Sequence, residues 1–161
     1  MQEKYWKYMV QIKAWIFYLD LYIENSYKWD KRINVFGAIA SSTSIAAWAI
    51  WQKLSFVWAV IIAISQVLTA IKDFMPYSKR LKVLVPFIEN LNFLYNKIEY
   101  NWFKVASGEL TEEEINNLLY TFKDEFTNME NKNLKEETLP ENDEFRKIAD
   151  EKTDAYFKNN F

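Results

Sequence analysis

Two apolar stretches decide the fold: INVFGAIASSTSIAAWAIW at residues 33–51 and SFVWAVIIAISQVLTAI at residues 55–71. Neither contains Asp, Glu, Lys or Arg. As helices they measure roughly 26–28 Å, about the thickness of the hydrocarbon core of a bilayer. Helices in the core of a soluble bundle, the alternative, normally keep a polar face, which these stretches lack apart from Ser, Thr, Asn and Gln. The sequence therefore predicts a transmembrane hairpin at residues 31–75.

Basic residues flank both predicted spans, whereas the short turn between them holds only Gln52 and Lys53. An excess of Lys and Arg marks the cytoplasmic ends of membrane helices. Both termini are therefore expected on the cytoplasmic side of a bacterial inner membrane, with membrane lipid as a partner.

The composition argues against an enzyme. The 161 residues include no Cys and no His, which removes thiolate chemistry, disulfides and the usual general base near neutral pH. No cofactor and no metal site are expected. The net charge of −2 divides unevenly, with +5 on residues 1–110 and −8 on residues 111–151.

Two long amphipathic helices are predicted on either side of the hairpin. Residues 1–30 carry an N-terminal helix, and residues 76–110 carry a long one whose apolar residues alternate at spacings of three and four. Such a seam is typical of a coiled coil between copies or of a long helix in a bundle. The two helices are expected to pack antiparallel. The seam residues are Leu81, Leu84, Ile88, Leu91, Tyr95, Ile98 and Trp102.

Short motifs predict where the remaining helices begin and end. Gly108 is expected to terminate the long helix in a left-handed conformation. Thr111 and Glu114 have the spacing of a capping box, which begins the acidic C-terminal helices at residues 111–161. Asn142 or Asp143 is expected to cap the last helix. The predicted fold is thus an all-α membrane protein, with a transmembrane hairpin above an antiparallel cytoplasmic helical bundle, assembled as an oligomer.

Polar and small residues recur along one stripe of each predicted span. At such spacing they either allow two helices to approach closely or line a water-filled path. One hairpin cannot enclose a pore, so the second interpretation requires several copies. The candidate pore-lining residues are Asn34, Gly37, Ser41, Ser44, Trp48, Ser65 and Thr69.

The layout resembles a known family. It has an N-terminal helix, a two-helix hairpin with a minimal turn, a long helix, and a tail in which Leu139-Pro140 precedes EFRKIADEKTDAYF. This order of elements is similar to that of the SLATT-type two-transmembrane effectors of bacterial nucleotide-signalling and antiphage systems. The resemblance implies a homo-oligomeric, tetrameric ion channel. It also implies a nucleotide or oligonucleotide signal, made by a partner nucleotidyltransferase, that opens the pore, depolarises the inner membrane and aborts phage infection.

An anionic signal would need basic contacts, because phosphates are bound by Lys and Arg. Anchoring to the membrane surface and simple solvation are the alternatives for the same side chains. Two other functions remain open: a membrane-anchored interaction or immunity module, and a holin-like lysis protein. The candidate ligand-binding residues are Lys79, Arg80, Lys82, Lys97, Lys104, Arg146 and Lys147.

Overall fold

The structure, a computed structural model, describes residues 1–50, 55–72, 77–134, 139 and 141–161. Within these ranges it gives the backbone but not the side chains of residues 39–50, 55, 58, 69, 71–72 and 77–78. The described residues form five α-helices: α1 (Gln2–Ile50), α2 (Ser55–Lys72), α3 (Tyr77–Ala106), α4 (Glu112–Asn133) and α5 (Asp143–Asn160). The expectation of an all-helical chain is thus confirmed for this part.

The chain divides into two units, and α1 contributes to both. Unit 1 consists of Met1–Glu24 and Lys82–Phe161, and unit 2 is Asn25–Leu81. The sequence predicts separate helices at residues 1–30 and 33–51, yet α1 continues through both. No Gly or Pro lies between residues 1 and 36, so nothing in the backbone chemistry of this stretch interrupts the helix.

The transmembrane hairpin predicted at residues 31–75 is wrong. Among the described residues no helix is both long and apolar enough to cross a membrane. The described part of the expected first span belongs to α1, and the expected second span lies in α2. The expectations of an ion channel and of an inner-membrane location with cytoplasmic termini are wrong for the same reason.

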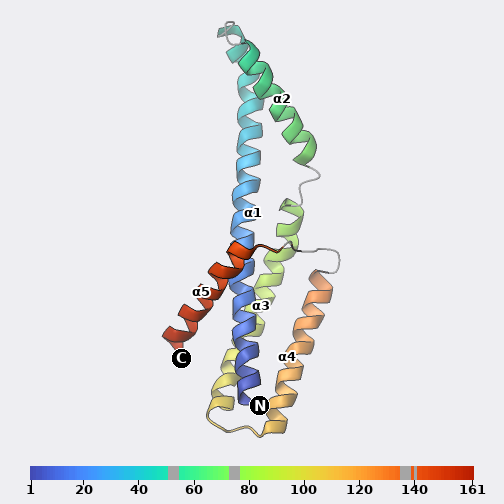
Figure 1. Ribbon diagram of the computed structural model, residues 1–161. Helices are drawn as coiled ribbons and strands as arrows, with labels where there is room; N and C mark the ends of the chain where they lie inside the picture. Colours follow the sequence, from blue (N-terminus) through green and yellow to red (C-terminus); the bar gives the residue numbers. More distant parts are fainter. Residues whose placement is uncertain (51–54, 73–76, 135–138, 140) are drawn as a thin grey trace. The chain divides into compact units, whose positions relative to one another are not determined.

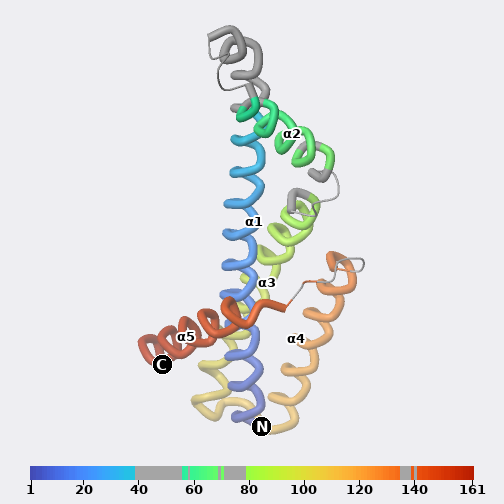
Figure 2. Tube along the Cα trace, turned by 45° about the horizontal axis from the view of Figure 1, so that its top comes forward, coloured from blue at the N-terminus to red at the C-terminus, as the bar shows by residue number. Residues whose placement is uncertain are grey.

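Unit 1 is built around the first half of α1, which contacts α3, α4 and α5 (Figures 1 and 2). The Tyr5 hydroxyl donates a hydrogen bond to the carbonyl of Ile98 at 2.8 Å, and Gln2 Nε2 donates to the carbonyl of Val105 at 2.8 Å. The start of α1 therefore lies beside the end of α3, so the two helices are antiparallel as expected. On the α4 side the Tyr8 hydroxyl donates to the carbonyl of Phe122 at 3.3 Å.

An aromatic cluster holds α5 against this pair. The Trp6 ring lies 4.8 Å from that of Trp102, 5.0 Å from Phe157 and 5.4 Å from Phe161, measured between ring centroids. At the other end of α5, Phe145 meets Tyr18 edge-on at 6.5 Å. Phe145, at the start of α5, contacts Tyr18, whereas Phe157, near its end, contacts Trp6. The direction of α5 is therefore antiparallel to that of α1.

The predicted helix ends are confirmed. Gly108 has a φ of 75° and its amide bonds to the carbonyl of Val105, while Glu109 N bonds to Lys104 O, the Schellman pattern that ends α3. Thr111 and Glu114 form both bonds of a capping box at α4. Asn142, the first of the two expected residues, caps α5 by accepting from Phe145 N at 3.1 Å.

Candidate functional site

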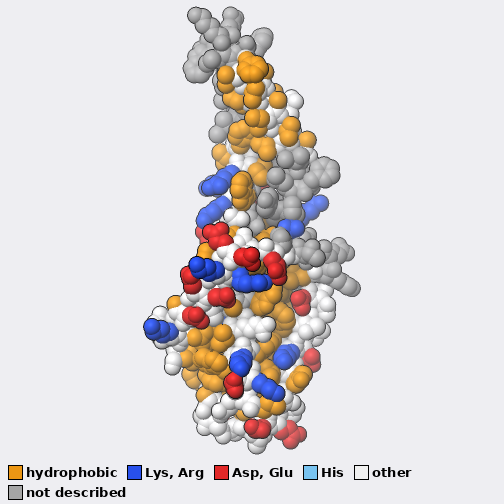
Figure 3. Space-filling model, in the orientation of Figure 1, with side chains coloured by type: hydrophobic (Ala, Val, Ile, Leu, Met, Phe, Trp, Pro, Cys, Tyr) orange, Lys and Arg blue, Asp and Glu red, His pale blue; other side chains and the backbone are white. Residues whose placement is uncertain are grey.

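The most unusual surface of the described residues is one face of α2. Ile61, Ile62, Ser65 and Leu68 are half-buried on one side of this helix, whereas the other side is exposed and apolar except for Gln66. Hydrophobic side chains also gather over the described part of unit 2 in the view of Figure 3. We call the exposed set the α2 apolar face: Phe56, Val57, Ala59, Val60, Ala63, Ile64, Val67 and Ala70.

The exposure of this face is large for apolar side chains. Phe56 is 80% exposed and Val67 is 58% exposed. The stretch from Ser55 to Ile71 contains no charged residue, so the face offers no ion pair to a partner. Ala59 and Ala63, one helical turn apart, leave room for another helix axis to come close. Contiguous exposed apolar surface of this kind marks sites of interaction.

The neighbouring part of α1 adds aromatic surface to unit 2. Tyr27 and Trp29 are about half exposed, and Val35 and Phe36 also reach solvent. The Arg32 guanidinium lies 5.5 Å from the Trp29 ring, a cation–π contact. Aromatic residues and Arg are enriched at protein interfaces, so this composition also favours an interaction surface.

The predicted pore-lining residues satisfy their polar groups on their own helices where these are described. Asn34 Nδ2 donates to Asp30 Oδ2 at 2.9 Å, and the Ser65 hydroxyl donates to the carbonyl of Ile62 at 2.8 Å. A Cβ on Gly37 would meet no described residue within 4 Å, so the described part of the chain gives no sign of a close approach of helices at Gly37. Their assignment to a pore lining stays a prediction without support, because no helix among the described residues is long and apolar enough to cross a membrane. The side chains of Ser41, Ser44, Trp48 and Thr69 lie outside the described residues.

The residues of the predicted oligomer seam pack inside the chain instead of lying on its surface. Leu84, Leu91 and Ile98 are at most 1% exposed, and they belong to the shared core of unit 1 with α1 and α4. Leu81, Ile88 and Tyr95 are also buried, and Trp102 is half-buried. This favours the bundle interpretation of the seam, because its side chains leave little surface for a second copy.

Three of the predicted ligand-binding residues, all in unit 1, lie beside different side chains. Lys97 pairs with Glu125 at 2.6 Å, and Arg146 pairs with Glu141 at 3.1 Å. Lys104 Nζ lies 5.2 Å from the Tyr100 ring. Each of these three has a different neighbour. The other four candidates lie on the surface, fully or partly exposed: Lys79, Arg80, Lys82 and Lys147.

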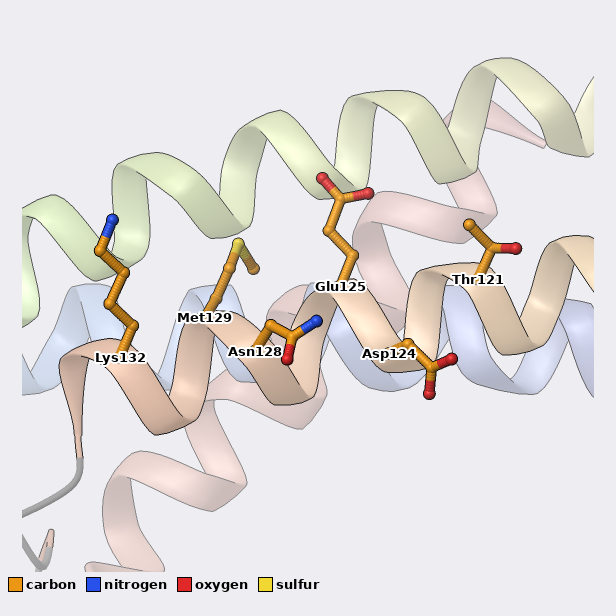
Figure 4. Close-up of a pocket in the computed structure, with 6 residues that line it drawn as sticks. All are labelled: Thr121, Asp124, Glu125, Asn128, Met129 and Lys132. Atoms are coloured by element: carbon orange, nitrogen blue, oxygen red, sulfur yellow. The ribbon is translucent and has the colours of Figure 1, made fainter.

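A hollow of about 450 Å³ follows α4 (Figure 4). All six of its lining side chains come from this one helix, so it is a groove along the surface rather than an enclosed pocket. In Figure 4, Glu125 and Met129 point toward α3, whereas Asp124 points away from it. No group of metal-ligating side chains occurs among the residues that the structure describes. Asp124 is exposed, and Glu125 pairs with Lys97 at 2.6 Å.

Sequence reasoning missed a half-buried polar network in unit 1. Lys13 Nζ lies 4.0 Å from the Tyr156 ring and 4.3 Å from the Tyr95 ring. Both phenol hydroxyls donate to Glu99 Oε1, at 2.6 Å from Tyr156 and 3.2 Å from Tyr95. Burial lowers the pKa of Lys13, and burial also raises the pKa of both tyrosines. The network joins α1, α3 and α5, and residues this far apart leave no periodic signal in a sequence.

Comparison with known proteins adds no relative: no family model, curated protein or solved structure matches the chain. The resemblance to the SLATT-type effectors therefore stays a prediction. The same holds for the nucleotide signal and the partner nucleotidyltransferase that the resemblance implies.

Proposed function

We propose that this protein is a non-enzymatic interaction module that associates with further copies of itself through the α2 apolar face. The observation that carries the proposal is the exposure of eight apolar side chains along one charge-free face of a single helix. Pore formation is not part of the proposal, because it needs helices that cross a membrane.

The chemistry of the face favours a second copy as its occupant. A symmetric contact between identical chains places the same patch on both sides, so the patch must be complementary to itself. A patch with one sign of charge would repel its copy, whereas a neutral apolar patch does not. The exposed residues run from Phe56 to Ala70, roughly 21 Å along the helix, which gives two copies of α2 a continuous line of contact.

Burial of these side chains supplies the driving force. Full burial of a Val, Ile or Phe side chain is worth about 1.5–3 kcal/mol. The Val, Ile and Phe side chains of the α2 apolar face still expose roughly half of their surface. The exposed Tyr27 and Trp29 of α1 extend the apolar area of the same unit. Because each copy contributes its own face, every substitution acts twice in a symmetric contact.

The experiment measures the molar mass of the purified full chain by sedimentation equilibrium over a wide concentration range. The wild type is expected to associate, and V60K/V67K is expected to weaken association by more than about tenfold, because it places Lys in an apolar contact. Y120K, a matched change at an exposed residue of α4, is expected to associate like the wild type. Circular dichroism checks that each variant keeps its helix content.

Three results would contradict the proposal. The first is a wild type that stays monomeric at all concentrations. The second is V60K/V67K associating as strongly as the wild type, and the third is Y120K losing association to the same extent. A tetramer, implied by the family resemblance, is one of the assemblies that this measurement would resolve.

A further inference from the structure

A second cavity lies wholly within unit 1, between α1 and α5. Its volume is about 310 Å³, at the small end of the range in which proteins bind small molecules. One wall is α1 with Trp15 and Tyr18, and the opposite wall is α5 with Arg146 and Asp150. Glu141, in the segment before α5, contributes to the rim.

Two alanines explain why a space remains between these helices. Ala14 on α1 and Ala149 on α5 both line the cavity, and Ala149 is 2% exposed. A larger side chain at either position would fill part of the space, as in an ordinary helix contact. The N-terminal end of α5 is also held against α1, because the backbone N–H of Asn142 donates to the Tyr18 hydroxyl at 3.2 Å.

The cavity combines aromatic rings with an excess of negative charge. The Trp15 and Tyr18 rings meet edge-on, 6.0 Å apart with an interplanar angle of 80°, and Trp15 is 40% exposed. Arg146 is engaged by Glu141 at 3.1 Å, which cancels one positive and one negative charge. Asp150 forms no ion pair with another described residue, so its carboxylate leaves a formal charge of −1 on the lining.

We propose that this cavity binds a small organic cation, a primary or quaternary ammonium compound. The positive group would lie against the face of Trp15, where cation–π attraction is strongest among the aromatic residues. The carboxylate of Asp150 would supply the opposite charge, and the alanine floor accommodates the hydrocarbon part of the ligand. No role of this kind follows from the proposed self-association, which uses unit 2.

An anionic ligand suits the cavity less well. Arg146 is the cation here, and it already has a carboxylate partner in Glu141. A phosphate would have to displace Glu141 and would also face Asp150, which repels it. The same residues therefore discriminate between the two charge types.

The experiment titrates the full chain with choline, phenethylamine, spermidine and inorganic phosphate by isothermal titration calorimetry. Binding of at least one of the three cations, and no binding of phosphate, is expected. D150N should weaken cation binding at least about tenfold, since it removes the unpaired charge. W15L should weaken it by removing the ring, and A14L should abolish it by filling the cavity. D154N, an exposed change on the same helix outside the lining, is the matched control and should bind like the wild type.

The indole N–H resonance of Trp15, identified by its loss in W15L, should shift on adding the bound cation and should shift much less with D150N at the same concentration. Absence of binding for all three cations would overturn the proposal. Stronger binding of phosphate, or unchanged cation binding by both D150N and A14L, would overturn it as well. Folding of every variant is checked by circular dichroism, and W15L tests the aromatic contact at a residue that is 40% exposed, where substitution removes no fully buried side chain.

Discussion

The L91A substitution is expected to destabilise unit 1 by about 3 kcal/mol. Leu91 is 0% exposed and lies in the middle of the α3 seam. The change removes three carbon groups, worth about 0.8 kcal/mol each for transfer out of water, and the space that they leave adds a further cost. For a chain of this size such a loss lowers the melting temperature by roughly 6–12 °C.

Urea unfolding followed by circular dichroism measures this loss, at two protein concentrations that differ widely. F93A on the same helix is the matched control: Phe93 is 68% exposed, so its removal should change stability by no more than about 0.5 kcal/mol. If Leu91 packed between copies, the effect of L91A would depend on concentration, because stability from assembly does. A loss below about 1 kcal/mol, or one that disappears at high concentration, would refute the assignment of the seam to the internal core.

Two further predictions concern the glycines and the tyrosines. G108A is expected to lower the free energy of unfolding in urea by about 1 kcal/mol, because an L-residue at φ 75° is strained. G37A should instead raise it by about 0.5–1 kcal/mol, because Gly37 lies inside a helix and no described residue lies within 4 Å of the new Cβ. Equal effects of the two substitutions would contradict this prediction. Burial raises the pKa of Tyr8 to about 12, and burial also raises that of Tyr5 and Tyr95. The folded state thus keeps protons that the unfolded state loses near pH 10. The contribution of these tyrosines to stability should therefore be constant below pH 10 and be lost between pH 10 and about 12, as measured by urea unfolding across that range.

Local signals in the sequence predicted local structure well. Gly108, the Thr111–Glu114 box and Asn142 each determine a helix end through hydrogen bonds to residues a few positions away, so the sequence contains all the information needed. The seam from Leu84 to Ile98 was also evident from its spacing. The spacing does not show which surface covers the seam. A stripe that packs against α1 has the same period as a stripe that packs against a second copy.

Contacts between distant residues could not be predicted in the same way. Lys13 and Tyr156 meet only because α5 packs back along α1, and the space between Ala14 and Ala149 depends on the same packing. The hairpin prediction failed for a different reason. It counted apolar residues in two stretches, whereas the first stretch continues a helix whose earlier part is charged, and no described helix is long and apolar enough to cross a membrane.

The two units differ in how their apolar residues are distributed, and this difference supports the proposed association. In unit 1 each helix has an apolar stripe and a polar face, so α1, α3, α4 and α5 can bury their stripes against one another. Among the described side chains of α2, the half-buried side is apolar except for Ser65 and the exposed side is apolar except for Gln66. One neighbouring helix covers only part of the circumference of another, so a helix with apolar residues on both sides leaves some of them exposed when it has a single partner. The exposed side of α2 therefore remains open to a further surface, and under the proposed association a second copy would supply one with the same lack of charge.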